Sequence, residues 1–338
     1  MIVIISCLSG ISFLVGKDTN FVYYGWFLIS IALFFVAKTY FKYDGSKLAI
    51  FSFYMCAFLL IGIVFTSISF EQALAQGRLS VFGNIRVLAN ALVIPLLFET
   101  HDLITNKNKS KSLLYKRSKS LVFLVLLIVL LMTVSRGAIF AYLFGSLIIV
   151  LKSKQKRILK IYLILAALYV SIFILEEQGV INILRLFNLS RLQTLGNRDH
   201  IWGYYLSELF SQDLLGILFG FGPGELYRVS GGVMSRGAYA HSVPLDFLFT
   251  YGIIGATIFS IIMCKLMKRI IKSKNTLAIS VFLTTIVLYF THGTVISREF
   301  YILTALVICL THNEINSQCF INSQNDKQNG NIIRKGVD

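Results

Sequence analysis

The chain has 338 residues, of which 56% are hydrophobic and only 14% charged, and its mean hydropathy is +0.74. These values lie outside the range of soluble domains and indicate a polytopic membrane protein. The formal net charge of +16 is explained by basic loops that orient a membrane chain and attract anionic headgroups. We therefore expect membrane lipids as partners and no nucleic acid.

Ten apolar stretches predict an all-α polytopic membrane protein of about ten transmembrane helices. Some of them, notably 121–134 and 300–310, are shorter than the ~20 residues that a spanning helix needs, so tilted or re-entrant segments stay open and the count is uncertain by one or two. In chain order the stretches are 1–16, 21–37, 48–70, 81–98, 121–134, 137–151, 158–175, 242–264, 277–296 and 300–310.

Basic clusters occupy every second connection, at 38–47, 107–119, 152–160 and 265–274. Because short cytoplasmic loops carry the excess of Lys and Arg, both termini are predicted to be cytoplasmic. We expect one membrane domain over residues 1–312, with a large periplasmic loop at 176–241. The Asn-, Gln- and Ser-rich segment 313–338 is predicted to be a disordered cytoplasmic tail. The first stretch has no basic leader or small-residue cleavage site and is expected to be a retained helix.

The two predicted faces differ in the kind of cation they carry. Nine of the ten Lys and Arg residues on the outer side are Arg, against four of the twenty-two on the cytoplasmic side. A lysine suffices to orient a helix, whereas a guanidinium grips phosphate or carboxylate bidentately. The outer face is therefore expected to hold an anionic group.

The long outer loop is where we expect the function to lie. Apolar periodicity at 181–189 and 201–210 predicts two amphipathic helices near the interface, and Asp199 is a candidate cap for the second. The run Gly220-Phe221-Gly222-Pro223-Gly224 predicts a turn. A phosphate cradle is the alternative, although no Gly-Lys-Ser sequence follows.

Arg136 and Arg198 are the outer arginines that we single out. Arg136 lies in a tight Ser-Arg-Gly reversal between two apolar stretches, where an ionisable residue is a functional candidate and an interfacial anchor is the alternative. Arg198 begins the second amphipathic helix, and a salt bridge to Asp199 or Glu225 is its alternative role. Candidates for a supporting, substrate-binding role are Arg78, Arg86, Arg191, Arg236, Arg298 and Trp202.

His241 immediately precedes the stretch 242–264 and is expected at the membrane surface beneath the loop. An imidazole there can exchange a proton near neutral pH, whereas a helix-capping or loop-bonded histidine is the plainer interpretation. Asp246 follows one turn later. We expect it to complement the helix N-terminus, and orientation of a partner group is the alternative.

His241-Ser242, nine further residues and Gly252-Ile253-Ile254-Gly255 resemble the His-(Asn/Ser/Gln)-x9-Gly-x-x-Gly signature of the O-antigen ligase and O-antigen polymerase superfamily. The Ser-Arg-Gly turn at 135–137, the Gly-Asn-Arg…Trp segment at 196–202 and the Gly-x-Gly-Pro-Gly turn at 220–224 are similar to it in order and spacing. Residues 77–84 also look like its Arg-rich entry to the fourth span. The chain departs from the family at Ile85-Arg86, where Pro-Asn is usual, and in being shorter than most members.

The resemblance implies a metal-independent membrane glycosyltransferase of the bacterial inner membrane, without a cofactor. Its donor would be an undecaprenyl-diphosphate-linked oligosaccharide, with Arg136 and Arg198 binding the diphosphate and His241 acting as general base. A chain-length regulator protein is a further expected partner. The motifs favour an O-antigen polymerase over a ligase that transfers the polymer to lipid A core. A transporter of lipid-linked oligosaccharide is the second alternative, although no internal repeat is visible.

Overall fold

The computed structural model describes residues 28–29, 31–39, 54–55, 57–62, 85–105, 113–133, 135–153, 160, 198–222, 242–291 and 300–311. Within these ranges all regular secondary structure is helical, which confirms the all-α class. The helices are α4 (Ile85–Thr105), α5 (Leu113–Met132), α6 (Arg136–Lys152), α9 (Arg198–Phe210), α10 (Leu214–Phe219), α12 (Val243–Ser273) and α13 (Thr276–Thr291), followed by a C-terminal helix at Phe300–Thr311.

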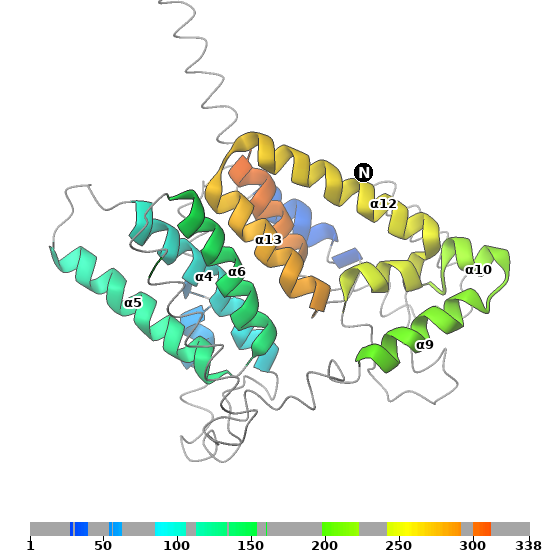
Figure 1. Ribbon diagram of the computed structural model, residues 1–338, viewed down its shortest axis with the longest axis horizontal. Coiled ribbons are helices and arrows are strands. Elements are labelled where there is room, and N and C mark those ends of the chain that lie inside the picture. The colour runs from blue at the N-terminus through cyan, green and yellow to red at the C-terminus, as the bar shows by residue number, and fades with distance from the viewer. Residues whose placement is uncertain are drawn as a thin grey trace, which may run out of the picture.

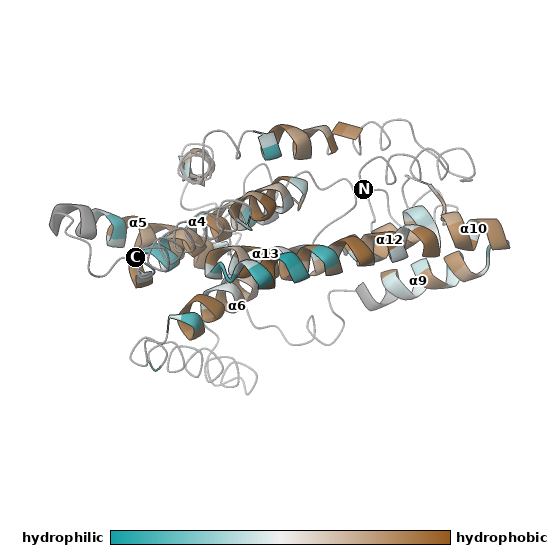
Figure 2. Cartoon of the chain, turned by 90° about the horizontal axis from the view of Figure 1, so that it is seen from above, coloured by the Kyte–Doolittle hydropathy of each residue, from teal (hydrophilic) through white to brown (hydrophobic). Residues whose placement is uncertain are grey.

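Two helices among the described residues are long and apolar enough to cross a membrane: Leu88–Thr105 within α4 and Val243–Ser273, which is α12. The helices Ser118–Met132, Gly137–Lys152, Thr276–Phe290 and Phe300–Thr311 are apolar but shorter. Hydrophobic residues dominate these helices in Figure 2. Predicted spans 1–16 and 158–175, the tail 313–338 and most of the loop 176–241 lie outside the described residues, apart from residue 160 and α9 and α10.

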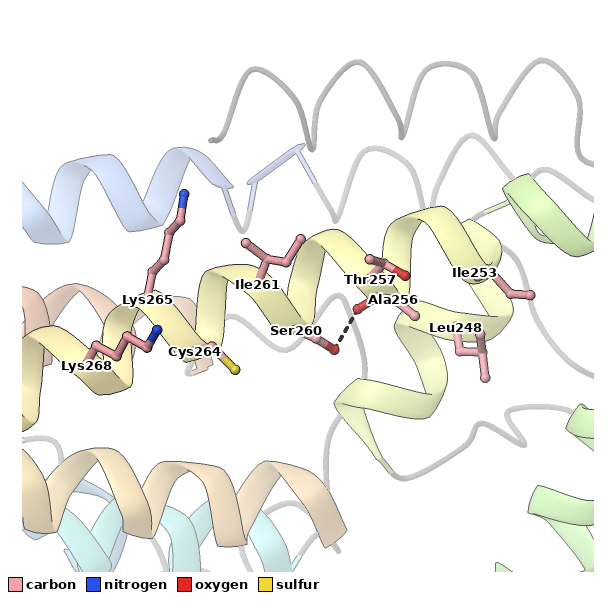
Figure 3. A pocket seen from close by; sticks show the side chains of 9 residues that line it. All are labelled: Leu248, Ile253, Ala256, Thr257, Ser260, Ile261, Cys264, Lys265 and Lys268. Carbon is pink, nitrogen blue, oxygen red and sulfur yellow. Dashed lines mark hydrogen bonds between the residues drawn. The ribbon is translucent and has the colours of Figure 1, made fainter.

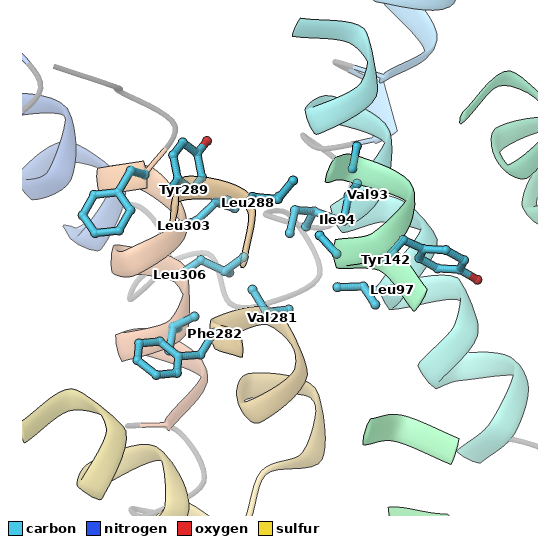
Figure 4. Packing of buried hydrophobic residues seen from close by; sticks show 14 of the residues in the cluster. Val93, Ile94, Leu97, Tyr142, Val281, Phe282, Leu288, Tyr289, Leu303 and Leu306 are labelled. Atoms are coloured by element: carbon cyan, nitrogen blue, oxygen red, sulfur yellow. The ribbon is translucent and has the colours of Figure 1, made fainter. Parts of the chain in front are cut away.

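The main core is formed where α4, α6, α13 and the C-terminal helix pack together. Leu97 of α4, Val281 of α13 and Leu306 of the C-terminal helix are almost completely buried, and Figure 4 shows α13 side chains between those of α4 and the C-terminal helix. Close contact of α6 with α13 depends on Gly145, because a Cβ there would lie 2.1 Å from Thr284 Oγ1. Small residues of this kind let helix backbones approach in membrane proteins.

Hydroxyl groups strengthen the same helix contact. Ser280 Oγ donates a hydrogen bond to Gly145 O (2.8 Å), and Thr284 Oγ1 donates to Ala141 O (3.3 Å). Interhelical bonds of this type contribute roughly 0.5–2 kcal/mol each in a membrane. Close packing at Gly145 and two interhelical hydrogen bonds therefore stabilise the α6–α13 contact, in addition to apolar burial.

The helix α4 continues to Thr105, although the predicted apolar stretch ends at residue 98. The acidic residues in this extension, Glu99 and Asp102, have hydrogen-bond or ion-pair partners. The Tyr54 hydroxyl donates a hydrogen bond to Glu99 Oε1, and Lys119 of α5 bonds to Asp102 and lies 3.9 Å from Glu99 Oε1. Glu99 is only 4% exposed. A buried carboxylate is tolerated where such partners exist, so these contacts tie α4 to α5 and to residues 54–62.

The helix α12 is bent sharply at Gly252, where φ is 63° and ψ is −165°. The rings of Phe247 and Phe259 stack at 4.4 Å, although a straight helix would separate these positions by about 18 Å. The short half of α12 (residues 243–251) therefore folds back on its long half (residues 253–273). The long half measures about 31 Å, enough to cross the hydrocarbon core by itself.

Candidate functional site

The turn between α5 and α6 places Arg136 at the first position of α6. Thr133 Oγ1 donates to Leu130 O (2.6 Å) and accepts a hydrogen bond from Ser135 N (3.3 Å). Ser135 is the N-cap, with φ −86° and ψ 93°, and its carbonyl accepts from Ile139 N. The connection between α5 and α6 is therefore residues 133–135, and the predicted Ser-Arg-Gly turn is wrong in detail, because Arg136 and Gly137 already belong to α6. The side chain of Arg136 lies outside the described part of the structure.

The described part of the long loop forms two helices joined by a tight connection. The helix α9 begins at Arg198, which confirms the predicted start, but Asp199 lies inside the helix and not at its cap. Asp213 caps α10 by accepting a hydrogen bond from Gly216 N (2.9 Å). Burial and the neighbouring Glu208 carboxylate raise the pKa of Tyr204, so its hydroxyl stays protonated and can donate.

The glycine-rich turn that follows α10 is bonded to the bend in α12. The Phe221 N–H donates to Phe249 O and the Gly222 N–H donates to Thr250 O, both at 3.0 Å. These carbonyls belong to the last turn of the short half, where the bend removes their usual helical donors. Of the run 220–224 predicted to form a turn, the structure describes residues 220–222, where the chain bends at Phe221. The backbone of these residues supplies the missing donors.

Two glycines make this junction sterically feasible. A Cβ on Gly252 would lie 2.4 Å from the Leu218 carbonyl, and a Cβ on Gly220 would lie 2.5 Å from Gly252 N. Both residues have positive φ, 63° and 75°, with extended ψ, a backbone region that is essentially restricted to glycine. Gly255 is required for a third reason, since a Cβ there would lie 2.1 Å from Tyr251 Cβ. The Gly-x-x-Gly pair thus builds the bend.

An aromatic cluster is packed between α9, the turn after α10 and the short half of α12. Phe249 stacks on Phe221 with ring centroids 4.5 Å apart and meets Tyr205 edge-on at 4.2 Å. Leu209 completes the cluster, and all four side chains are at most 5% exposed. Aromatic pairs in this geometry contribute about 0.5–1.5 kcal/mol each beyond area burial. The loop helices and the short half therefore form one packed unit.

The N-terminal end of the short half carries buried polar groups. Ser242 is the N-cap and is fully buried, but its side chain makes no capping bond, and its Oγ has no hydrogen-bond partner within the described ranges. Asp246, one turn later, is 8% exposed and interacts electrostatically with Tyr301 of the C-terminal helix. His241 lies outside the described residues and immediately precedes this N-cap.

Three helix N-termini face the same side of the molecule. In Figure 1 α6, α9 and α12 all begin on the lower side, whereas α12 ends at the upper side. These helices begin at Arg136, at Arg198 and just after His241-Ser242. Helix N-termini carry partial positive charge and free N–H groups, so they favour anions. The described backbone thus brings the starts of the three main candidate segments to one side.

A groove of about 560 Å³ follows the outer surface of α12 (Figure 3). It begins beside the bend and continues toward the basic end of the long half, and its Ser260 Oγ donates to Ala256 O (2.8 Å). Small and apolar side chains line most of the groove, among them Leu248, Ile253, Thr257 and Cys264. Two lysines, Lys265 and Lys268, line its far end.

The supporting residues predicted from sequence are described only in part. Arg86 is the second residue of α4, and Trp202 lies half-buried on α9. The side chains of Arg86, Arg136 and Arg198 are outside the described part, as are all of Arg78, Arg191, Arg236 and Arg298. Arg136 and Arg198 therefore lie at the starts of α6 and α9, and His241 immediately precedes the N-cap of α12. Binding of a diphosphate by the arginine side chains stays a prediction.

Comparison with known families reaches the same region of the chain. Residues 121–260 match the model of a family described as O-antigen ligase. Over residues 121–260 the match confirms the resemblance to the O-antigen polymerase and ligase superfamily. The matched region contains Arg136, Arg198 and His241 together with the glycines of the bend. The match supports a general enzyme role of the glycosyltransferase kind and, with the apolar helices, a membrane protein. No curated protein matches the chain.

Sequence reasoning missed the bend in α12, α10 and the contact between them. The available signal was Gly252 and Gly255 inside an otherwise apolar run, since glycine in a helical pattern marks a break or a close approach. Hydropathy alone cannot reveal the bend, because the apolar helix Val243–Ser273 continues through it.

Proposed function

We propose that the protein is an O-antigen polymerase, which joins lipid-diphosphate-linked oligosaccharide repeats at the periplasmic face of the bacterial inner membrane. The observation that carries the proposal is the family match over 121–260, which covers the three candidate reactive residues. In this proposal about ten spans surround the site, both termini are cytoplasmic and the donor is carried on undecaprenyl diphosphate.

The reaction transfers a glycosyl group from the lipid diphosphate to a sugar hydroxyl. The bond from the anomeric carbon to the phosphate oxygen breaks, a bond to the acceptor oxygen forms, and the diphosphate leaves with increased negative charge. Arg136 and Arg198 hold this diphosphate without a metal ion, helped by the supporting arginines. Fixed positive groups at such a position contribute several kcal/mol to barrier lowering. His241 accepts the proton of the attacking hydroxyl.

The helix starts support this assignment. A guanidinium at the first position of α6 and another at that of α9 add full charges to N-termini that already favour anions. His241 precedes the N-cap of a half-helix that Gly252 and Phe221 fix against the loop. The half-helix that follows His241 and the loop helices therefore belong to one packed unit, as a reaction with a defined geometry requires.

The groove along α12 suits the lipid part of the donor. It starts at Leu248 of the short half and runs along apolar side chains of the long half, so a polyisoprenoid chain lying there would leave its diphosphate near the N-terminal end of α12. Burial of hydrocarbon against this surface adds affinity without specifying the sugar.

A ligase is the second candidate, because the matching family is described by that name. It differs from a polymerase in the acceptor, the lipid A core instead of another lipid-linked repeat. His241-Ser242-Val243 in place of the His-Asn-Glu of compared ligases, and Arg-Gly in place of Arg-Ala at the turn, favour the polymerase. A lipid-linked oligosaccharide transporter is the third candidate and would leave polymer length unchanged.

A lipopolysaccharide gel of the native host separates these candidates. Deletion of the gene should leave core plus a single repeat, and wild-type protein should restore the ladder. Core without any repeat, together with accumulated lipid-linked polymer, would identify a ligase. An unchanged ladder would refute both transferase assignments. A chain-length regulator, if it acts on this protein, would shift the modal length without abolishing the ladder.

A further inference from the structure

The connection between α9 and α10 exposes three large apolar side chains, which we call the apolar tip. Phe210, the last residue of α9, is 58% exposed, and Leu214 and Leu215, the first two residues of α10, are 71% and 54% exposed. In Figure 1 and in Figure 2 α10 lies at one end of the described structure, beyond the bend of α12 and away from α13. The tip therefore lies at the edge of the helix bundle.

Packing of the loop helices on α12 does not account for the exposure of the tip. The side chains that join the loop to α12 form the aromatic cluster around Phe249, and the tip residues are not part of that cluster. The sequence of α10, Leu-Leu-Gly-Ile-Leu-Phe, has no polar side chain, and none of its residues is fully buried. Single exposed apolar residues are ordinary, whereas adjacent ones on a wholly apolar helix mark an interaction surface.

The helix α10 is held against the point where the long half of α12 begins. A Cβ on Gly252 would lie 2.4 Å from the Leu218 carbonyl, so the two backbones are in contact. The long half belongs to an apolar helix that is long enough to span a membrane, and its side chains Ile253 and Ile261 are exposed. Exposed apolar side chains on a spanning helix face lipid acyl chains. The tip is therefore next to the end of a lipid-facing span, at the level of the membrane surface.

The size of the tip suits a lipid surface better than a protein partner. A fully exposed side chain of this size offers roughly 200 Å², so three that are little more than half exposed offer about 350 Å² together. A stable protein interface takes about 800 Å² from each partner. An apolar element that enters the boundary between headgroups and acyl chains by about 5–10 Å needs no such area.

The charges near the tip are compatible with shallow insertion. Asp213 is exposed and accepts the hydrogen bond of the α10 cap from the Gly216 N–H, so its carboxylate can stay among the headgroups while Leu214 and Leu215 lie deeper. Between residues 201 and 222 the chain has no Lys or Arg, so attraction to anionic headgroups does not contribute here. Insertion therefore depends on the apolar side chains.

We propose that the apolar tip inserts among the lipid acyl chains beside the end of α12 and holds α9 and α10 at the membrane surface. The partner of this surface is the bilayer itself, and insertion requires only that the long half of α12 spans it. This role goes beyond the proposed transfer reaction and does not depend on it. The groove along α12 begins beside the same bend, at Leu248 and Ile253 (Figure 3), so a lipid that enters the groove at that end passes next to the tip.

Spin labelling of the full chain in lipid nanodiscs tests the proposal. The five native cysteines are replaced by alanine, and single labels are attached after Leu214→Cys or Leu215→Cys. Collision rates of each label are measured with oxygen, which concentrates among acyl chains, and with a water-soluble nickel chelate. Ser207→Cys on the exposed side of α9 is the aqueous control, and Ile261→Cys, about 14 Å along α12 from Gly252, is the membrane control.

The ratio of oxygen to nickel collisions should be several-fold higher for Leu214→Cys and Leu215→Cys than for Ser207→Cys, and should approach the ratio for Ile261→Cys. A ratio equal to that of Ser207→Cys would overturn the proposal, because the tip would then lie in water. Low collision rates with both reagents would also overturn it, because protein would then cover the tip.

Wild-type protein provides a second measurement that requires no substitution. The protein is reconstituted into phosphatidylcholine vesicles that contain a lipid with a photoreactive diazirine in the upper part of one acyl chain, then irradiated and digested. Modified residues are located by mass spectrometry. Adducts are expected on residues 210–215 as well as on the long half of α12. Adducts on the long half together with none on residues 210–215 would rule out insertion of the tip.

Discussion

Gly252→Ala tests whether the bend in α12 is what holds the loop helices. The new methyl group would lie 2.4 Å from the Leu218 carbonyl and 2.6 Å from Gly220 N, and all three atoms concerned are backbone atoms that cannot rotate away. The backbone region at φ 63° and ψ −165° costs a non-glycine residue about 1–3 kcal/mol. Overpacking against a fixed neighbour adds about 1–3 kcal/mol.

Relief of this clash would require the turn after α10 to leave α12. Departure would break the bonds from Phe221 and Gly222 to the short half, worth about 1 kcal/mol each, and would lose the ring contact of Phe221 with Phe249. Either route costs about 2–6 kcal/mol, a large part of the stability of an ordinary domain.

The assay is thermal unfolding of detergent-purified protein combined with limited proteolysis of α9 and α10. Gly252→Ala should lower the midpoint, increase cleavage in α9–α10 and reduce activity. Gly203→Ala is the control, because a Cβ on this α9 glycine meets nothing within 4 Å and alanine gains up to about 1 kcal/mol of helix propensity. Equal midpoints and equal cleavage in Gly252→Ala and wild type would refute the reasoning.

Three further changes probe contacts elsewhere. Gly145→Ala should destabilise the protein by about 1–3 kcal/mol, because its methyl group would meet Thr284 Oγ1 at 2.1 Å; an unchanged melting midpoint would contradict the close α6–α13 fit. Lys119→Met removes the cation bonded to Asp102 and should cost about 1–2 kcal/mol in the same melt, discounted for partial exposure of both groups. Asp213→Ala should remove the α10 cap at a cost of about 1 kcal/mol, seen as faster proteolysis after α9, and Asn at this position should restore resistance.

Helix positions were predictable where apolar runs and tight turns coincide. The predicted apolar stretch 137–151 agrees with α6 (Arg136–Lys152) to within one residue at each end, and Arg198 was correctly placed at the start of α9. Helix ends near charge were less predictable. Lys116 and Arg117 lie inside α5, which begins at Leu113 and not at the predicted 121, and α4 ends at Thr105 and not at 98. An apolar stretch ends at the first charged residues, whereas a helix continues through charged residues whose side chains have partners or reach solvent.

The bend at Gly252 could not be predicted from hydropathy because it depends on a contact distant in sequence. In the sequence, Gly220 and Gly252 are two separate glycines, either of which could occur in a turn. The reason both must be glycine is that their backbones approach each other closely, which only the structure shows. The family signature marked Gly252 and Gly255 as a pattern, and the structure supplies the physical reason for that pattern: a left-handed break and a close approach to Tyr251. The burial of Asp246 was likewise invisible, since the sequence shows an acid in a first helical turn and not what covers it.

We propose that His241 is the base of a glycosyl transfer from a lipid diphosphate. The most direct measurement is turnover of a lipid-diphosphate-linked oligosaccharide by purified wild type and His241→Ala, with donor binding measured on the same samples. We expect His241→Ala to bind donor as the wild type does and to lose at least about a hundredfold in turnover. Near-normal turnover by His241→Ala would contradict it.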